Sequence, residues 1–369
     1  MAYDYLIVGA GLFGAVFAHE MTVRGKTCLV IDRRDHVGGN VYTKSMNGIN
    51  VHVYGAHIFH TDNKEVWDYM NRFAEFNNYV NSPIARIHDE LYNLPFNMNT
   101  FHELWGVITP SQAQMRIRSQ IVKPKNGEPE NLEEQALSLV GTDIYEKLIK
   151  HYTEKQWGRP CNELPASIIK RVPLRFTYDN NYFDSRYQGI PIGGYTPIIK
   201  KMLTGCEVKL STDFKDVAGI PCEKIVYTGP IDELMNYELG HLEYRTLFFE
   251  TQSLPTLDDF QGNAVVNYTG DEVAYTRIIE HKHFEFGTRN PNIKGTVITR
   301  EIPVPWTEGA EPYYPINDDT NDALYGRYLV KARAMYANKL ILGGRLGNYK
   351  YMDMDAVVAA ALESARLQP

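Results

Sequence analysis

The stretch Tyr3-Asp-Tyr-Leu-Ile-Val-Gly-Ala-Gly-Leu-Phe-Gly14 lies almost at the start of the chain and contains its strongest structural signal. The apolar run Tyr5–Val8 predicts a short buried strand, and the apolar spacing beyond it predicts a helix. Between them, Gly9, Gly11 and Gly14 form a Gly-x-Gly-x-x-Gly turn. In that order, these glycines allow a tight turn, let backbone N–H groups approach a pyrophosphate, and let the helix pack closely on the strand. Because the helix dipole also favours phosphate, the stretch predicts a dinucleotide-binding unit.

A second predicted strand, Cys28–Ile31, ends in Asp32. An acid about 20 residues after such a turn accepts a hydrogen bond from a ribose hydroxyl, which selects an adenosine dinucleotide with a free 2′-OH. The glycine spacing alone also fits an ordinary strand-to-helix turn, but strand, helix and acid together argue against that alternative. The stretch Arg33–Asn40 adds a short basic run and the doublet Gly38-Gly39, which resembles the extended fingerprint of glutathione-reductase-like flavoproteins. We therefore expect FAD and not NAD.

Size and composition restrict the class of protein. A chain of 369 residues exceeds one typical core, so two or three domains are expected. The net charge of -7 argues against a nucleic-acid partner, and no stretch approaches the ~18 apolar residues of a membrane span. The four cysteines are dispersed, so we expect no metal site, no redox disulfide and a cytoplasmic location. Met1 leads almost directly into the first strand, which leaves no room for a signal peptide.

The predicted elements divide the chain into three domains. From Asn99 to Trp157 the pattern is helical, with one helix over Thr142–Lys155 capped by Thr142 or Asp143. From Leu242 strands follow one another without helices, which indicates an antiparallel sheet. We therefore expect an α/β fold with a discontinuous Rossmann-like FAD-binding domain, a helical insert domain and an antiparallel β-sheet domain. The predicted bounds are 1–80, rejoined by 190–240 and 322–369, for the FAD-binding domain; 97–184 for the helical domain with a mobile substrate loop; and 241–321, with the hairpin 81–96, for the sheet domain.

The end of the chain is expected to return to the first domain. Lys339–Arg345 reads as a final parallel strand with a glycine turn, and Asp353 or Asp355 would cap the alanine-rich helix that continues through Ala365. The N-terminus of this helix would face the flavin pyrimidine, whose carbonyl edge becomes more anionic on reduction. This arrangement would favour the reduced cofactor.

Three stretches carry candidate ligand-binding residues whose patterns leave alternatives open. Trp157, before a glycine at a helix end, fits a packed anchor or a stacking platform for a nucleobase. Arg171, in the long loop that follows, fits a solvated charge or a bidentate phosphate clamp. His57 and His60 lie beside glycines, but no Cys, Asp or Glu at ligand spacing completes a metal site, so a loop against the flavin ring is the better interpretation.

Several long motifs occur in one order along essentially the whole chain, and together they resemble the bacterial UDP-galactopyranose mutase family. The motifs are Gly9–Gly14, Tyr54–Thr61, Lys155–Gly158, Lys170–Phe176, Asn181–Phe183, Tyr275–His281, Glu311–Pro315 and Gly343–Gly347. The resemblance implies an isomerase that interconverts UDP-galactopyranose and UDP-galactofuranose and requires reduced FAD. It also implies a covalent reduced-flavin–sugar adduct through which the sugar ring contracts. A UDP-sugar substrate, a homodimer, an external electron donor and a role in cell-surface polysaccharide synthesis are implied as well.

The resemblance also implies roles for individual residues. Arg171 and Arg277 would hold the substrate diphosphate and His60 would lie against the flavin; these three are the candidate catalytic residues. In the substrate site, Tyr182 and Tyr351 would donate to the phosphates, Trp157 would stack near the uracil, Tyr152, Thr153 and Asn267 would surround the uridine, and Asn81, Tyr314 and Asp353 would line the sugar pocket. The implied flavin-binding residues are Gly9, Gly11, Phe13, Gly14, Asp32, Arg33, Gly39, Asn40, His57, Arg345 and Met352.

Two departures from the family pattern bear on specificity. Leu148-Ile149 stand where aromatic residues are expected before Tyr152, which affects the packing around the uracil. Ala56, together with the stretch Asn93–Thr100, resembles the branch of the family that also accepts UDP-N-acetylgalactosamine. Both specificities therefore stay open.

Two other functions also fit parts of the sequence. An amine-oxidase-like flavin oxidoreductase would share the opening motif and the closing strand, turn and helix, but Arg171 and Arg277 would then have no diphosphate to bind. A non-catalytic nucleotide-sugar binding protein with a structural FAD would bind UDP without turnover. A pyridine-nucleotide reductase fits less well, because no second Gly-x-Gly-x-x-Gly follows a later strand.

Overall fold

The computed structural model describes residues 2–169, 172–285, 293–307 and 309–369. The chain forms two compact units, each built from separate segments. The first unit contains residues 1–78, 185–246 and 306–369, and the second contains residues 79–184 and 247–305. The predicted division of the chain into three domains with the bounds given above stays a prediction.

A five-stranded parallel sheet lies at the centre of the first unit. Its strand order is β16 (Leu340–Leu342), β10 (Cys222–Tyr227), β1 (Tyr3–Val8), β2 (Cys28–Ile31) and β9 (Glu207–Lys209). The middle strands are apolar because they are covered on both faces, as is usual for parallel sheets. The late segments pair directly with the opening strand, which confirms the predicted discontinuous Rossmann-like fold.

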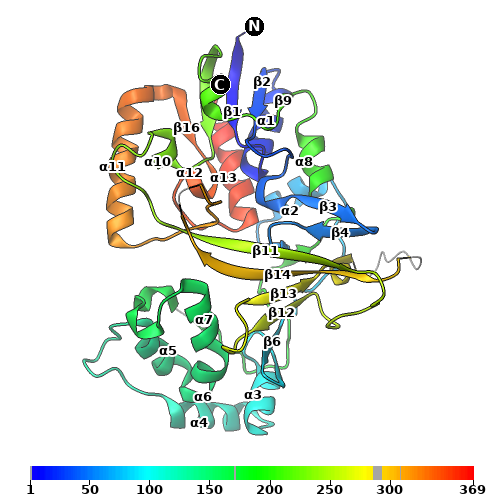
Figure 1. The fold of residues 1–369 in the computed structure, drawn as a ribbon, viewed down its shortest axis with the longest axis vertical. Helices are drawn as coiled ribbons and strands as arrows, with labels where there is room; N and C mark the ends of the chain where they lie inside the picture. The colour runs from blue at the N-terminus through cyan, green and yellow to red at the C-terminus, as the bar shows by residue number, and fades with distance from the viewer. Residues whose placement is uncertain (1, 170–171, 286–292, 308) are drawn as a thin grey trace. The chain divides into compact units, whose positions relative to one another are not determined.

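Helices pack on this sheet around the main core of the first unit. Figure 1 shows α1 (Leu12–Val23) and α13 (Met354–Arg366) beside the sheet, and the two helices contact each other. Phe17 and Val358 are completely buried in their shared core. The remaining elements of the unit are the hairpin β3 (Thr43–Met46) and β4 (Ile49–His52), β5 (Phe59–Thr61), α2 (Lys64–Asn71), β8 (Tyr187–Gly189), α8 (Thr196–Met202), α9 (Phe214–Val217), α10 (Ile231–Leu234), β15 (Tyr314–Pro315), α11 (Asp319–Tyr336) and α12 (Gly344–Gly347).

The second unit contains a sheet with the strand order β11 (Tyr244–Leu254), β14 (Thr296–Pro305), β13 (Arg277–Glu280), β12 (Val265–Tyr268), β6 (Ile84–Ile87) and β7 (Glu90–Asn93). The first residues of β11 belong to the first unit and pair there with β15. The β12–β13, β13–β14 and β6–β7 pairs are antiparallel, whereas β12 and β6 are parallel. The β6–β7 hairpin comes from a distant part of the chain, so no tight turn forces it to run antiparallel to β12.

The helices of the second unit surround a core of their own. Met98, Phe101 and Tyr145 are buried there, from helices that the sequence predicted. The elements are α3 (Met98–Trp105), α4 (Pro110–Gln120), α5 (Leu132–Val140), α6 (Thr142–Ile144), a π-helix (Tyr145–Ile149) and α7 (Lys150–Trp157).

The predicted continuous helix over Thr142–Lys155 is wrong in two respects. Gly141 occupies the N-cap position without a side-chain cap, and the carboxylate of Asp143 accepts instead from Trp105 Nε1 at 2.8 Å. The π-helix then interrupts the α-helical pattern. It lets Leu148 and Ile149 enter two different hydrophobic clusters, so both side chains are buried in the protein core.

The sequence also missed or overextended elements in the first unit. Helix α11 was not predicted, because few of its side chains are buried and its apolar residues form no clear stripe. The spacing of apolar residues over 65–76 predicts one helix, but helix α2 ends earlier, at Asn71, and Phe73 and Phe76 beyond it still pack into the core. The apolar residues after Asn71 are spaced as in a helix because they pack into the core, although the backbone there is not helical.

Candidate functional site

The glycine turn after β1 brings three backbone segments so close that side chains would not fit. A Cβ on Gly14 would lie 2.0 Å from the carbonyl oxygen of Gly9, and a Cβ on Gly39 would lie 2.9 Å from Gly11 Cα. Gly9 has a φ of +108°, a conformation that side-chain-bearing residues rarely adopt. The turn therefore presents bare backbone, as close approach of a phosphate group requires.

Asp32 follows β2 and is 7% exposed, with a backbone partner for each carboxylate oxygen. Its Oδ2 accepts from Ala10 N at 2.8 Å, and its Oδ1 accepts from Arg34 N at 2.9 Å. Ala10 belongs to the glycine turn and Arg34 to the loop after β2, so the two bonds hold the carboxylate of Asp32 beside the turn. Each oxygen keeps a lone pair that a ribose hydroxyl could use.

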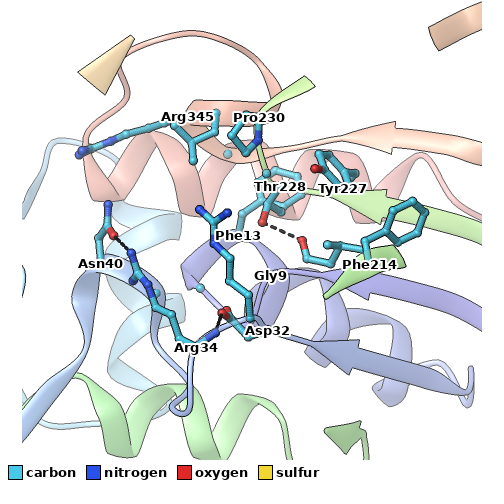
Figure 2. Close-up of a pocket in the computed structure, with 18 of the residues that line it drawn as sticks. Gly9, Phe13, Asp32, Arg34, Asn40, Phe214, Tyr227, Thr228, Pro230 and Arg345 are labelled. Carbon is cyan, nitrogen blue, oxygen red and sulfur yellow. Dashed lines mark hydrogen bonds between the residues drawn. The ribbon is translucent and has the colours of Figure 1, made fainter. Parts of the chain in front are cut away.

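A cavity of about 400 Å³ opens at the carboxyl edge of the parallel sheet, entirely within the first unit. Figure 2 shows Asp32, Arg34, Asn40, Phe13 and Arg345 around it. The residues predicted to bind the cofactor line this cavity, except Met352: they are Gly9, Gly11, Phe13, Gly14, Asp32, Arg33, Gly39, Asn40, His57 and Arg345. The carbonyl oxygen of Met352 instead accepts from Arg345 Nε at 2.7 Å.

The sequence pattern missed a second group of lining residues, which comes from the segment after β9 and from the end of β10. Phe214 and Tyr227 supply aromatic surface there, with ring centroids 5.8 Å apart, and Thr228 donates to Val8 O at 2.8 Å (Figure 2). The available signal was positional: in open α/β sheets, ligands bind outside the carboxyl ends of the strands. Tyr227 ends a strand that pairs with β1, so its neighbourhood could have been expected to line the site.

The charged side chains of the cavity neutralise one another. Arg34 lies 2.6 Å from Glu311 and donates to Asn40 Oδ1 at 3.0 Å, whereas Arg33 lies 3.4 Å from Glu233 and 3.3 Å from Glu311. Burial acts to raise the pKa of Glu311, but the positive charges of Arg34 and Arg33 outweigh it and lower that pKa. These ion pairs connect the loop after β2 to the segments that carry Glu233 and Glu311, and this connection fixes the shape of the cavity.

These features fit an adenosine dinucleotide. The bare glycine backbone suits the pyrophosphate, Asp32 suits a ribose, and the aromatic residues suit a planar ring system. The volume lies in the usual range for small-molecule and cofactor sites.

A second group of predicted residues gathers in the second unit, where α7 faces the β12–β13 hairpin. Arg277 on β13 donates from Nη2 to the hydroxyl of Tyr152 on α7 at 3.0 Å. Its Nε lies 3.7 Å from Glu301, whose side chain is 5% exposed. Asn267 is the register partner of Arg277 on β12. A guanidinium and a phenol are therefore held together beside an amide.

Tyr182 belongs to the same region. Its backbone N–H donates to Asn81 O at 2.8 Å, and its carbonyl accepts from Arg175 Nη2 at 3.1 Å. Tyr182 is 44% exposed, but partial desolvation of its hydroxyl raises its pKa, while the positive charges of Arg277 and Arg175 act in the opposite direction. The hydroxyl therefore stays protonated near neutral pH and can donate a hydrogen bond.

Thr153 and Trp157 lie on α7 with Tyr152. Thr153 is buried, and Trp157 is partly buried against the helical core, so the indole is a packed anchor with part of its surface open. Gly158 ends the helix in the left-handed conformation, with φ of +67°. Arg171 lies outside the described residues, so its predicted role stays a prediction.

A third group lies in the first unit around Arg345. The guanidinium lies 4.9 Å from the ring centroid of Tyr351 and 5.8 Å from that of Tyr314. Tyr351 donates to Asp353 Oδ1 at 2.9 Å, and burial together with the Asp353 charge raises the pKa of its hydroxyl. Asp353 stands at the N-cap of α13, but its side chain makes no cap hydrogen bond. The carboxylate therefore orients the tyrosine and does not cap the helix.

His60 does not line the cofactor cavity. It lies on β5, and its Nδ1 is 3.1 Å from Ser185 Oγ. Within the described residues, two other groups of side chains bring possible metal-ligand atoms within 4.8 Å of one another: His88, Asp271 and Glu272, and Asp259, Glu280 and His283. None of these six was predicted as a functional residue.

Comparison with known proteins identifies the family. A family profile described as UDP-galactopyranose mutase matches residues 147–351, and one for NAD(P)-binding Rossmann-like domains matches residues 7–73. The probable UDP-galactopyranose mutase of Klebsiella pneumoniae is 41% identical over 98% of this chain and 94% of its own. This chain belongs to the UDP-galactopyranose mutase family. Its members with that name are isomerases, and this chain is accordingly an enzyme of that class.

Other members of the mutase family differ in the substrate that their names state. The dTDP-fucopyranose mutase of Escherichia coli is 37% identical over 98% of this chain and 97% of its own. A crystal structure of reduced UDP-galactopyranose mutase is similar in fold, with a TM-score of 0.74, 15% identity, and coverage of 99% of this chain and 93% of that one. Membership in the mutase family therefore does not by itself fix the base or the sugar.

Among the described residues, no helix is long and apolar enough to cross a bilayer.

Proposed function

We propose that this chain is a flavin-dependent mutase that interconverts UDP-galactopyranose and UDP-galactofuranose. The observation that carries the proposal is the group formed by Arg277 and Tyr152 with Asn267 beside them. A guanidinium next to phenol and amide groups is suited to a nucleoside diphosphate. An amine-oxidase-like enzyme would have no diphosphate for this group to bind.

We propose FAD in its reduced form as the cofactor. Gly9, Gly11 and Gly39 would hold the pyrophosphate, Asp32 the ribose, and Phe214 and Tyr227 would offer aromatic surface at the same cavity. When bound, reduced FAD would supply the nucleophile that lets the sugar ring open and contract without net oxidation. The four cysteines, as strong nucleophiles, lie outside the lining of this cavity.

In this proposal, Arg277 performs electrostatic catalysis. The diphosphate is both the binding handle and the leaving group, so its negative charge grows as the bond to the sugar breaks. A guanidinium fixed by Tyr152 and near Glu301 is already oriented when that charge develops. Tyr182, whose hydroxyl stays protonated, would donate to the same phosphates, and Arg171 would add a second cation.

We propose that the residues around Arg345 contact the sugar. Tyr314, Tyr351 and Asp353 offer two phenol rings and a carboxylate next to a cation. The Tyr351–Asp353 bond fixes the direction of the phenol, so a sugar hydroxyl would meet an oriented acceptor. Asn81, Thr153 and Trp157 would complete the substrate contacts, and His60, which lies outside the lining of the cavity, would approach the flavin from β5.

We propose UDP-galactose as the main substrate and UDP-N-acetylgalactosamine as a second one. The family profile and the relative with 41% identity carry the first name, whereas a relative with 37% identity is named for dTDP-fucopyranose. Leu148 and Ile149 are buried in two different clusters of the protein core, which leaves Tyr152 and Trp157 on α7 to offer aromatic rings near the base. A homodimer in the cytoplasm, which depends on an external electron donor, completes the proposal.

The test is a substrate panel with dithionite-reduced holoprotein under anaerobic conditions. UDP-galactofuranose, UDP-N-acetylgalactosamine and dTDP-fucopyranose are incubated separately, and products are separated by anion-exchange chromatography. The proposal expects pyranose product from the first and furanose product from the second. Conversion of dTDP-fucopyranose alone would replace the proposed substrate, and conversion of none of the three by flavin-loaded protein would contradict the proposed reaction.

A further inference from the structure

Lys155 carries a charge that the proposed reaction does not use. It lies on α7, one helical turn after Tyr152, and its ammonium group donates to the carbonyl oxygens of Tyr268 at 2.9 Å and Tyr275 at 3.1 Å. Among the described residues, no carboxylate forms an ion pair with it at 4 Å or less. A half-buried lysine that bonds only to backbone carbonyls costs desolvation energy, so its position calls for an explanation.

The two carbonyls stand on either side of the connection between β12 and β13. Tyr268 ends β12, Tyr275 lies just before β13, and Tyr268 N donates to Thr276 O at 2.8 Å between them. One ammonium group thus joins both arms of the hairpin and attaches them to α7. The rings of Tyr268 and Tyr275, at 4.7 Å and 79° to each other, pack at the same place.

The same helix and hairpin carry the proposed nucleotide site. Arg277 is two residues beyond Tyr275, and its bond to Tyr152 is another polar contact between α7 and this hairpin. Asn267 precedes Tyr268 and is the register partner of Arg277. A shift of α7 against the hairpin would therefore move Tyr152 away from the guanidinium.

We propose that Lys155 is a positioning residue that clamps α7 to the β12–β13 hairpin and so holds Tyr152 and Arg277 at the spacing that a nucleoside diphosphate requires. The inference deepens the proposed function and rests on it. Lys155 does not touch the substrate; it acts through Tyr152 and Arg277. Its removal would take this donor from two carbonyls and would leave α7 without the lysine contact to the hairpin.

The contact that Lys155 makes should depend on pH, because the charge of its side chain does. Burial lowers its pKa to about 8, and the negative charges of Glu272 and Asp271 only partly oppose this. The other charged groups nearby are Arg86 and Arg300, whose guanidinium groups lie over the rings of Tyr268 and Tyr275, and His88, which faces Glu272. Below about pH 8 the ammonium can donate to both carbonyls, and above it the neutral amine has lost part of that capacity.

The experiment measures UDP binding to flavin-loaded protein by isothermal titration calorimetry between about pH 7 and about pH 9, on either side of the Lys155 pKa. Lys155→Met is compared with Lys155→Arg, which keeps a donor and a charge at both values. Lys150→Gln is the matched control, since Lys150 begins the same helix and pairs only with Glu146 at 2.9 Å among the described acids. Melting temperature and flavin content check that each variant is folded.

The proposal expects Lys155→Met to weaken UDP binding at about pH 7 by roughly tenfold or more, as a displaced binding group does. Lys150→Gln should bind as the wild type does, and Lys155→Arg should restore binding. Wild-type affinity should fall between the two pH values, and the fall should be absent in Lys155→Arg. In turnover assays, KM should rise more than kcat falls.

Two outcomes overturn the inference, and they are distinguishable from failure of the proposed function. Equal UDP affinity of Lys155→Met and wild type would show that the clamp does not position the site. If Lys155→Met does not fold, equal pH dependence in wild type and Lys155→Arg would overturn the positioning role instead. If folded wild type binds no UDP, the proposed nucleotide site itself is wrong and the positioning role falls with it.

Discussion

Arg277 is the residue on which the proposed chemistry depends most. Its guanidinium bonds to Tyr152 and lies near a buried carboxylate, so it is oriented before a substrate arrives. We predict that Arg277→Ala leaves flavin content unchanged and lowers kcat/KM by roughly 10²-fold or more, as removal of a transition-state donor does. Steady-state assays with reduced protein measure this effect.

The neighbouring strand offers a matched control. Arg300 lies on β14 next to Glu301 and therefore projects from the opposite face of the sheet, where it pairs with Glu250 at 3.3 Å. Arg300→Ala should keep nearly wild-type kcat/KM. An equal loss in both variants would mean that Arg277 acts through stability or net charge and not through a contact with the diphosphate.

Glu280 is a residue whose importance the sequence did not reveal. It is completely buried, and its carboxylate accepts from Thr296 Oγ1 at 2.6 Å and from the backbone N–H groups of Phe260 and Gln261, each at 2.9 Å. Burial acts to raise its pKa, but these bonds and His283 at 3.4 Å outweigh burial and lower the pKa to about 2. Its sequence neighbours gave no sign of this, because its partners come from three separate segments.

Glu280 makes stability dependent on pH. Because its pKa is lower in the folded than in the unfolded chain, its contribution is present above about pH 4.5 and is lost as pH falls toward about 2. We predict that Glu280→Gln lowers the free energy of unfolding near neutral pH by about 3 kcal/mol, as removal of a buried charge partner does. Urea unfolding at several pH values is the measurement. An unchanged acid dependence in the variant would assign that dependence to other carboxylates.

Individual glycines and acids of the cofactor cavity could be placed from the sequence because they act locally. Gly9, Gly11 and Asp32 belong to one strand–turn–helix–strand unit, so spacing alone brings them together. Phe214 and Glu311 also line the cavity, but they come from late segments that only the tertiary fold brings to it. Arg277 and Tyr152 are 125 positions apart, and the family resemblance, not a pattern of spacing, indicated them.

At the level of elements, the opening turn is the part of the structure most sensitive to added atoms. A Cβ on Gly14 would lie 2.0 Å from Gly9 O, so α1 would have to move away from β1. We predict that Gly14→Ala reduces flavin content and costs about 1–3 kcal/mol of stability, in the range of overpacked cores. Flavin absorbance per protein and thermal unfolding measure the two effects.

Gly326 provides the contrasting case. It lies inside α11, with no atom within 4 Å of the place where a Cβ would stand. Gly326→Ala should therefore keep full flavin content and gain up to about 1 kcal/mol from helix propensity. A loss of flavin in Gly326→Ala equal to that in Gly14→Ala would show that flavin content reports general stability and not the geometry of the turn.

The elements that could be predicted were those whose buried residues form a continuous apolar run or repeat at one regular spacing. The strands β1 and β2 are continuous apolar runs because both faces are covered, and their predicted bounds agree closely with the structure. The π-helix over Tyr145–Ile149 could not be predicted from the apolar pattern. It shifts the helical periodicity once, so that Leu148 and Ile149 pack into two separate hydrophobic clusters. Helix α11 was missed for the opposite reason, because most of its surface is polar or open.

At the scale of the whole molecule, the chain passes between its two units several times, and each unit is made from segments far apart in sequence. The discontinuous Rossmann-like fold was predicted because the late strands have the same short apolar character as the first. The mutase relative from Klebsiella pneumoniae matches 98% of the chain, so the two units belong to one enzyme. The central claim therefore concerns the reaction of the complete, flavin-loaded protein.

That claim is an isomerisation that needs reduced flavin and leaves it reduced. The most direct measurement follows UDP-galactopyranose formation from UDP-galactofuranose together with visible flavin absorbance, in matched anaerobic samples of oxidised and dithionite-reduced protein. We predict many turnovers in the reduced sample with no change in flavin absorbance, and almost none in the oxidised sample. Equal conversion in both samples, or oxidation of the sugar in step with flavin reduction, would contradict the account and favour an oxidoreductase.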